Sequence, residues 1–343
     1  MWEYVVRRVL FMFPILVGVL AFTFLISHII PADPVGVYLG KQANNPELRA
    51  NVTARYHLDE PLEVQFYYYM KGVFTGDLGY SFLYKEDVSE ILAIRLPATI
   101  ELITFAIIIA IPTGIFLGVV SATKRNTVWD AIARFVALLG ISVPTFFLAL
   151  AVQIIFVSSW NVFPLAGRFP NTKTPPPDIT GLYTIDSILS LDIQDLVTSI
   201  YYIALPSFVL GFSIIGYILR MTRSSMLEVM SSDYVKAARA KGVPERRVVY
   251  GHALKNAMGP TLTIAGLTIG GAITYTVFVE SIFVWPGIGE VAVEWTKEAD
   301  FSGILGFTIL VTLGFLVANL MVDILYVFID PQVRLGGKSS YAG

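Results

Sequence analysis

Apolar runs divide the chain into six stretches that are long enough to cross a bilayer, with polar segments between them. A transmembrane helix needs roughly 20 consecutive, mostly apolar residues. Because each run reaches about that length, the pattern predicts an all-α integral membrane protein with six transmembrane helices. The expected spans cover residues 9–30, 97–120, 132–157, 200–219, 261–284 and 304–328.

The first apolar run has a cleaved signal peptide as its alternative explanation. Its apolar stretch is longer than a signal core, and no small-x-small cleavage site follows it before Pro31. Arg7 and Arg8 precede the run. We therefore expect residues 1–30 to form a retained N-terminal transmembrane helix that starts in the cytoplasm.

The polar segments define the remaining organisation. Residues 31–96 are mixed in charge and long enough to form a small external insert between the first and second spans. Residues 97–330 are expected to form a five-helix core, and residues 331–343 a cytoplasmic tail. Most lysines and arginines fall in segments that this topology places in the cytoplasm, and most acidic residues fall in external segments. This is the positive-inside pattern.

Residues 228–260 form a long basic segment between two strongly apolar runs, and its centre predicts a helix, a glycine break and a second helix. The hydroxyl of Ser231 or Ser232 can accept from free amides of the first turn. Gly242 can take the left-handed conformation that ends a helix, and Pro244 suits the start of the next one. A smooth helix face suits insertion into a groove on another protein. The residues that share this face are Tyr234, Ala237, Ala238 and Lys241.

This basic segment resembles the cytoplasmic coupling segment of ABC-importer permeases, in particular the dipeptide and oligopeptide branch. The resemblance rests on residues 233–235, 238–242 and 252–257, where Lys236 and Lys255 depart from the generic motif as is usual for that branch. We call residues 228–260 the coupling segment. Further sequence motifs that resemble the same branch occur at residues 57–62, 76–81, 95–101, 164–168, 280–289 and 329–334. The alternative for the segment is a solvated basic loop that only obeys the positive-inside rule.

The resemblance implies a type I ABC-importer permease fold, forming half of a translocation path for a peptide-like or oligosaccharide substrate. It also implies three kinds of partner: a second homologous permease subunit, two ATP-binding subunits and an extracytoplasmic substrate-binding protein. ATP and Mg²⁺ are then expected on the partners, with no cofactor, metal or nucleic acid on this chain. The residues implied to contact the ATPase are Asp233, Tyr234, Ala237, Ala238, Arg239, Lys241 and Gly242.

Polar or helix-bending residues within the spans are candidates for the translocation path, namely Glu101, Ser142, Pro144, Asn319 and Asp323. Glu101 lies near a span end, where a structural role is favoured over a substrate contact. Pro144 permits a bend that suits either gating or packing. Asn319 and Asp323 share one helix face. They are expected either to form a hydrogen bond that packs two helices together or to line the path. Gly114 and Gly118 have the spacing of a close helix contact.

The composition agrees with a membrane protein, and the sequence contains no motif that indicates an enzyme. The chain has 343 residues, of which 55% are hydrophobic and 15% charged, with a mean hydropathy of +0.68. It has no cysteine and three scattered histidines, which build no metal site. Residues 337–339 mimic the end of a phosphate loop, but Gln332 replaces the required glycine. A secondary transporter and a non-transport membrane scaffold remain the alternatives; the first would more often carry several deep charges, and the second would not need the coupling segment.

Overall fold

Helices account for nearly all of the secondary structure in the computed structural model, which describes residues 2–29, 34–39 and 44–329. The long helices are α1 (Trp2–Ile29), α5 (Val88–Thr123), α9 (Ile193–Met230), α12 (Leu254–Phe283) and α14 (Phe301–Ile329). Five described helices are long and apolar enough to cross a membrane, and one bent pair is a sixth candidate. The prediction of an all-α, multi-pass protein is confirmed. The expected tail at 331–343 lies outside the described residues.

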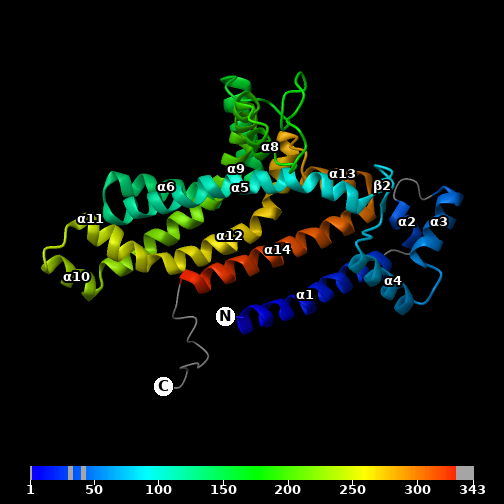
Figure 1. Cartoon of the computed structure of the whole chain (residues 1–343), viewed down its shortest axis with the longest axis horizontal. Coiled ribbons are helices and arrows are strands. Elements are labelled where there is room, and N and C mark those ends of the chain that lie inside the picture. Colours follow the sequence, from blue (N-terminus) through cyan, green and yellow to red (C-terminus); the bar gives the residue numbers. More distant parts are fainter. Residues whose placement is uncertain (1, 30–33, 40–43, 330–343) are drawn as a thin grey trace.

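Close contacts between long helices run along the length of the molecule (Figure 1). A Cβ atom on Gly114 of α5 would lie 2.8 Å from Ile218 of α9, and one on Gly118 would lie 2.5 Å from Thr222. Any side chain at these two positions would push the helices apart. The predicted glycine pair is confirmed as a helix contact, which brings α5 and α9 together at the centre of the bundle.

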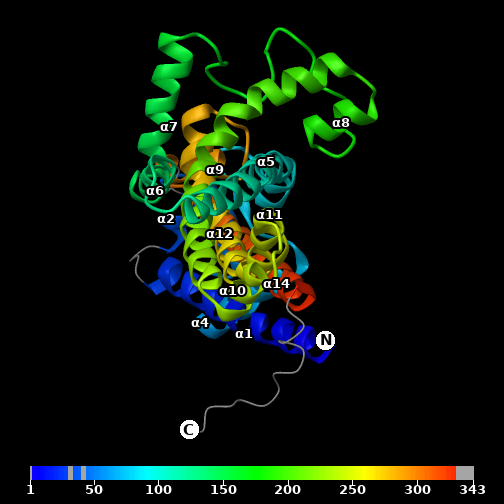
Figure 2. The same ribbon diagram turned by 90° about the vertical axis from the view of Figure 1, so that its left-hand side faces the viewer.

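The expected third span over residues 132–157 is bent in the structure, at the proline that the sequence marked as permitting a bend. The structure has two helices there, α6 (Val128–Ser142) and α7 (Thr145–Gln153), the second extended by a π-helical turn, η2 (Ile154–Ser159). They are bent by 109°. The break lies at Val143 and Pro144, whose ψ angles of 121° and 136° are extended, because proline disfavours helical geometry in the residue before it. Figure 2 shows α7 and α8 (Tyr183–Leu189) projecting from one side of the bundle.

Several helices extend beyond the apolar runs that predicted them. Helix α5 begins at Val88 rather than at Pro97, which is accommodated inside the helix. Helix α9 likewise starts at Ile193 and continues to Met230. The short helix α13 (Ile288–Glu298) follows α12. The apolar pattern reports only the membrane-length part of a helix, so polar residues at either end were left out of the predicted spans.

The segment between α1 and α5 forms a small unit of its own, which we call the insert. It contains α2 (Pro34–Leu39), α3 (Pro46–Tyr56), α4 (Leu62–Thr75) and a two-stranded antiparallel hairpin of β1 (Tyr80–Ser81) and β2 (Glu86–Asp87). Ser81 donates to Asp300 beside α14 at 2.6 Å, and Trp295 donates to Ser81 at 3.1 Å. These buried hydrogen bonds tie the insert to the start of α14. That the insert is external stays a prediction.

Candidate functional site

The coupling segment contains a short helix, α10 (Asp233–Ala240), at the end of the molecule opposite the insert (Figure 1). Val235 is completely buried and anchors this helix to the long helices. The predicted serine cap is wrong. The hydroxyls of Ser231 and Ser232 donate instead to carbonyls of Glu228 and Val229, at 2.7 and 2.5 Å. Since α9 ends only just before, its last carbonyls are free to compete for these hydroxyls.

Gly242 ends α10 as predicted, with a φ of +74°. Its N–H donates to the Arg239 carbonyl at 2.9 Å, and the Val243 N–H donates to the Ala238 carbonyl at 3.2 Å. This pair of bonds is the Schellman arrangement that satisfies the last carbonyls of a helix. The turn therefore fixes the direction in which α10 leaves the bundle.

The predicted contact face of α10 is largely open to its surroundings. Tyr234 is 46% exposed, Ala237 and Lys241 are exposed, and Ala238 is half-buried. The Tyr234 hydroxyl accepts from the Asn256 amide at 2.8 Å, which orients the ring. Asp233 instead pairs with Lys236 at 3.0 Å on the surface.

The second half of the coupling segment joins the fifth span without a break. Helix α11 (Glu245–Arg247), the π-helical turn η3 (Val248–Ala253) and α12 form one continuous helix, so the second helix predicted in this segment runs directly into the fifth span. Arg239 makes two hydrogen bonds to Glu245, at 2.7 and 3.1 Å, across the Gly242 turn. These bonds raise the pKa of the Arg239 guanidinium above its ordinary value. The turn is therefore closed by an ion pair as well as by the backbone.

A buried ion pair lies beneath the coupling segment and was missed from the sequence. Arg223 of α9 binds both carboxylate oxygens of Asp130 in α6, at 2.9 and 3.1 Å, and Ser121 of α5 donates to the same carboxylate at 2.6 Å. Asp130 is fully buried. The one available signal was a lone acidic residue in the first turn of an apolar helix. The pair links three helices next to the segment that leads into α10.

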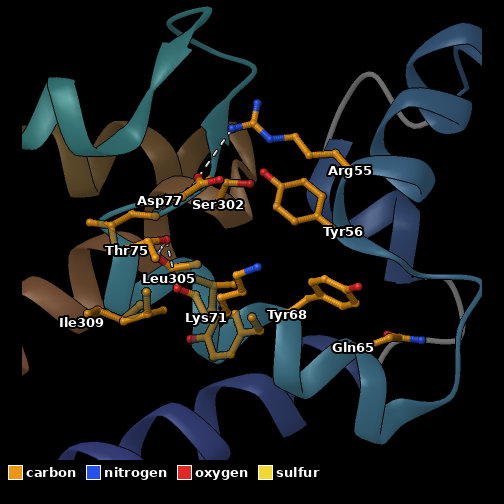
Figure 3. A pocket seen from close by; sticks show the side chains of 15 residues that line it. Arg55, Tyr56, Gln65, Tyr68, Lys71, Thr75, Asp77, Ser302, Leu305 and Ile309 are labelled. Carbon is orange, nitrogen blue, oxygen red and sulfur yellow. Dashed lines mark hydrogen bonds and ion pairs between the residues drawn. The ribbon is translucent and has the colours of Figure 1, made fainter.

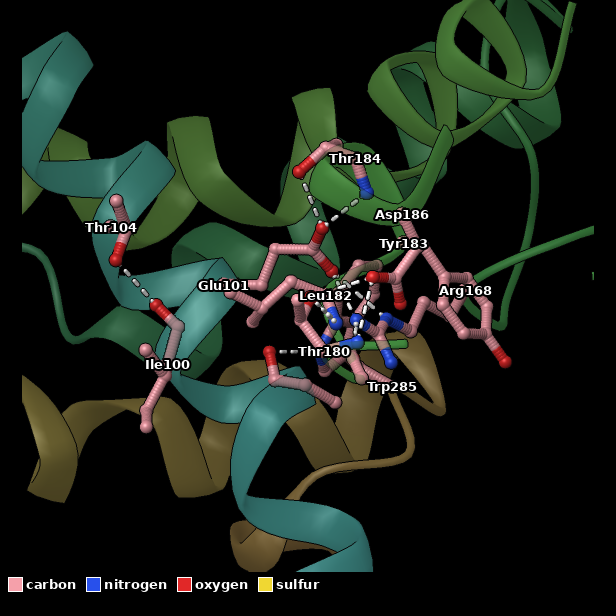
Figure 4. Close-up of polar contacts among 12 residues, drawn as sticks. Ile100, Glu101, Thr104, Arg168, Thr180, Leu182, Tyr183, Thr184, Asp186 and Trp285 are labelled. Carbon is pink, nitrogen blue, oxygen red and sulfur yellow. Dashed lines mark hydrogen bonds and ion pairs between the residues drawn. The ribbon is translucent and has the colours of Figure 1, made fainter. Parts of the chain in front are cut away.

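Glu101 is held in a second buried cluster, shown in Figure 4. Arg168 donates to the Glu101 carboxylate, with its Nε at 3.0 Å, and Thr184 donates to it through both its backbone N–H (2.8 Å) and its hydroxyl (2.6 Å). The Arg168 guanidinium also lies 3.8 Å from the centre of the Tyr183 ring. These contacts attach the loop between α7 and α9 to α5, and they occupy both carboxylate oxygens.

The remaining path candidates lie apart from Glu101. Ser142 and Pro144 flank the bend between α6 and α7. Asn319 is half-buried, and its side-chain oxygen lies 3.3 Å from the Cβ position of Gly270 in α12. The side chain of Asp323 lies outside the described residues. Among the described side chains, no hydrogen bond joins any two of these candidates.

Glu280 begins the stretch 280–289 that resembles the permease family, and its side chain organises the turn between α12 and α13. Its carboxylate accepts from Thr99 at 2.7 Å and from the Gly289 N–H at 2.6 Å, and it is fully buried. A Cβ on Gly287 would lie 2.4 Å from Glu280, and one on Gly289 would lie 2.6 Å from Val277. The two glycines are needed because the backbone passes directly over the carboxylate.

The long apolar helices belong to an integral membrane protein, and comparison with known families gives its class as a transport subunit. Residues 114–335 match the family described as the binding-protein-dependent transport system inner membrane component, and residues 1–104 match its N-terminal companion. The chain belongs to this family. It is an ABC-importer permease of the dipeptide and oligopeptide branch, a multi-pass membrane protein and not an enzyme, since the ATPase of such importers resides in separate subunits.

Individual relatives are similar over almost the whole chain. The dipeptide transport system permease DppB of Alkalihalophilus pseudofirmus is 42% identical over 334 residues, covering 97% of this chain and all of the relative. A probable D,D-dipeptide transport system permease of Escherichia coli is 37% identical, covering 98% of each chain. A di/tripeptide transport system permease of Pseudomonas aeruginosa is 36% identical, covering 97% of this chain and 99% of the relative.

Proposed function

We propose that this chain forms half of the translocation path of an ATP-driven importer for short peptides, delivered by an extracytoplasmic binding protein. The observation that carries the proposal is α10, a short helix with exposed Tyr234 and Ala237 that is fixed by buried Val235 and by the Gly242 turn. Such a rigid, small-residue face suits a groove on a partner protein. The three relatives are named as dipeptide or di/tripeptide permeases, which favours peptides over oligosaccharides as the cargo.

The proposed complex contains a second homologous permease subunit and two ATP-binding subunits, which hold ATP and Mg²⁺. Closure of the ATP-binding subunits moves α10 together with α9 and α12, to which it is joined. Arg223 and Asp130 carry the displacement into α6, because a buried two-point ion pair keeps α9 and α6 in fixed contact. The cavity then turns outward to receive the peptide, and hydrolysis turns it inward.

The proposed orientation places the chain in the cytoplasmic membrane with both termini inside and the insert outside. This orientation is supported by the positive-inside pattern, because it places most lysines and arginines in the cytoplasm. Ser142, Pro144, Asn319 and Asp323 remain candidates for lining the path. The contacts of Glu101 with Arg168 and Thr184 favour a structural role for that residue, since its carboxylate has no oxygen left unbound.

Uptake by the reconstituted complex tests the proposal. Proteoliposomes that contain this chain with its partner subunits, loaded inside with ATP, are given radiolabelled dialanine and the binding protein outside. Accumulation is expected with ATP and not with a non-hydrolysable analogue. Uptake driven by an ion gradient without ATP would identify a secondary transporter, and absence of dialanine uptake under every condition would contradict the peptide proposal.

A further inference from the structure

The exposed side chains of α5 and α14 are apolar over the membrane-length part of each helix. On α5 they are Ile100, Thr104, Ile108, Pro112 and Phe116, and among the described side chains of α14 they are Leu313, Phe315, Val317 and Met321. The hydroxyl of Thr104 is satisfied within its own helix, since it donates to the Ile100 carbonyl at 2.7 Å. Such surfaces suit contact with lipid tails.

Helix α12 differs, because its exposed face carries two hydroxyl groups without a partner. Thr274 and Tyr275 are both exposed, and none of the described residues forms a hydrogen bond with either hydroxyl. An unbonded hydroxyl on a lipid-facing surface is costly, because hydrocarbon offers it no partner. This face of α12 therefore suits water or a polar ligand better than lipid.

Tyr275 also lies too deep for the belt of aromatic residues at a membrane interface. Its ring lies over Gly271, one turn earlier, since a Cβ atom on that glycine would be 3.8 Å from the ring atom Cε2. At 1.5 Å per residue, Gly271 is about 15 Å from Thr261, where the predicted fifth span begins. This is the middle of a hydrocarbon core about 30 Å thick. The ring therefore leans toward the membrane centre and not toward the outer surface.

The same face of α12 meets the bend between α6 and α7. The rings of Phe278 in α12 and Phe146 in α7 have their centres 6.1 Å apart, and each side chain is about half exposed. Phe278 shares a face with Thr274 and Tyr275, because it follows them by four and three residues. Ser142 ends α6 at this bend; it is exposed, and its hydroxyl has no partner among the described residues. The bend thus joins a path candidate from the sequence to residues of α12 that were not predicted.

The surface formed by α12 and the bend is uncharged, unlike the cavity between the insert and α14 that Figure 3 shows. In that cavity Arg55 pairs with Asp77 at 3.5 Å and with Asp87 at 3.2 Å. Together with Lys71, these groups carry no net charge, so the cavity is balanced within the insert. An uncharged surface that offers hydroxyls suits a dipeptide zwitterion, which has no net charge and has backbone groups that form hydrogen bonds.

We propose that Thr274 and Tyr275 line the translocation path beside Ser142 and form hydrogen bonds with the peptide backbone as the cargo passes. This assignment rests on the proposed function of the chain as half of a peptide path. A tyrosine hydroxyl both donates and accepts, so it can bind either the N–H or the C=O groups of a peptide, whatever its side chains. Because these contacts involve no charged side chain, they are weak enough for the peptide to leave again.

Reaction with a charged, water-soluble methanethiosulfonate tests whether this face is hydrated, because the chain has no cysteine of its own. Thr274→Cys and Ser142→Cys are compared with the control Ile108→Cys, which changes an exposed residue in the middle of the second predicted span. The full complex in nanodiscs is treated, and the label on this chain is measured after the subunits are separated. We expect Thr274→Cys and Ser142→Cys to react and Ile108→Cys not to react, since the reagent does not enter lipid.

Contact with the peptide is tested by uptake of radiolabelled dialanine. Tyr275→Phe keeps the ring and removes the hydroxyl, so kcat/KM for uptake should fall several-fold while ATP hydrolysis without binding protein stays unchanged. The matched control Tyr67→Phe changes an exposed tyrosine of the insert that also has no hydrogen-bond partner among the described residues. This control should take up dialanine as the wild type does.

Equal labelling of Thr274→Cys and Ile108→Cys, or wild-type uptake by Tyr275→Phe, would overturn the inference. Labelling of Thr274→Cys in the isolated chain but not in the complex would also reject it, because the face would then be the contact with the second permease subunit. The expected labelling in a complex whose wild type takes up no dialanine would uphold a hydrated path along α12 and reject the peptide cargo. Dialanine uptake by the wild type without labelling of Thr274→Cys would reject this inference alone.

Discussion

Ala237→Arg provides the sharpest test of α10 as the contact with the ATP-binding subunits. Ala237 is exposed, so in the free chain the change should alter the free energy of unfolding by no more than about 0.5 kcal/mol. In a closely fitted groove the added side chain overpacks the contact, which costs about 1–3 kcal/mol, and desolvation of an unpaired charge adds to this. Since about 1.4 kcal/mol is a tenfold change in an equilibrium constant, association should weaken about tenfold or more. Ala237 is preferable to Ala238, which is half-buried and would perturb the fold itself.

The assay measures binding of the ATP-binding subunits to the purified chain, and then ATP hydrolysis with and without loaded binding protein. Ala54→Arg serves as the control, because Ala54 is also an exposed alanine on a helix but lies in the insert at the other end of the molecule. The control should bind the ATP-binding subunits as the wild type does. If Ala237→Arg also binds them normally and its hydrolysis responds normally to the binding protein, α10 is not the contact.

Three further predictions concern the turn, the buried ion pair and the topology. Gly242→Val should cost about 1–2 kcal/mol or more from backbone strain alone, since no atom lies within 4 Å of the Cβ position, and hydrogen exchange at the end of α10 should accelerate. Gly242→Asn should be milder because asparagine tolerates this conformation, and equal exchange in the two variants would contradict the reasoning. Arg223→Gln removes the two-point partner of buried Asp130 and leaves only Arg134, 3.7 Å from the carboxylate. It should lower stability by about 1–3 kcal/mol, less than for a fully buried pair, because Arg223 is partly exposed and Arg134 remains. Adding Asp130→Asn should restore part of this loss in thermal denaturation, and failure to do so would show that the pair is not coupled. Single cysteines should label from outside intact cells at Thr172 and Lys297 and not at Thr127 and Ser231, and the reverse pattern would overturn the orientation.

The sequence alone determined the class of the protein and the C-terminal end of α10. Bilayer thickness fixes both the length and the composition of a spanning helix, so apolar runs predict spans without knowledge of their neighbours. A left-handed turn is also a local property, and for this reason Gly242 could be predicted from the residues beside it. The same local reasoning correctly predicted the close contact at Gly114 and Gly118.

Only the tertiary structure decided which polar groups meet. Arg168 reaches Glu101 across 67 residues and Arg223 reaches Asp130 across 93, and neither partner is adjacent by any helical spacing. The 109° bend at Pro144 also depends on packing, since proline permits a bend in a membrane helix without requiring it. Ser81 in the insert likewise donates to Asp300 beside α14, 219 residues further along the chain. Helical periodicity shows that a side chain is buried, but its partner depends on which helices approach closely enough to bury it.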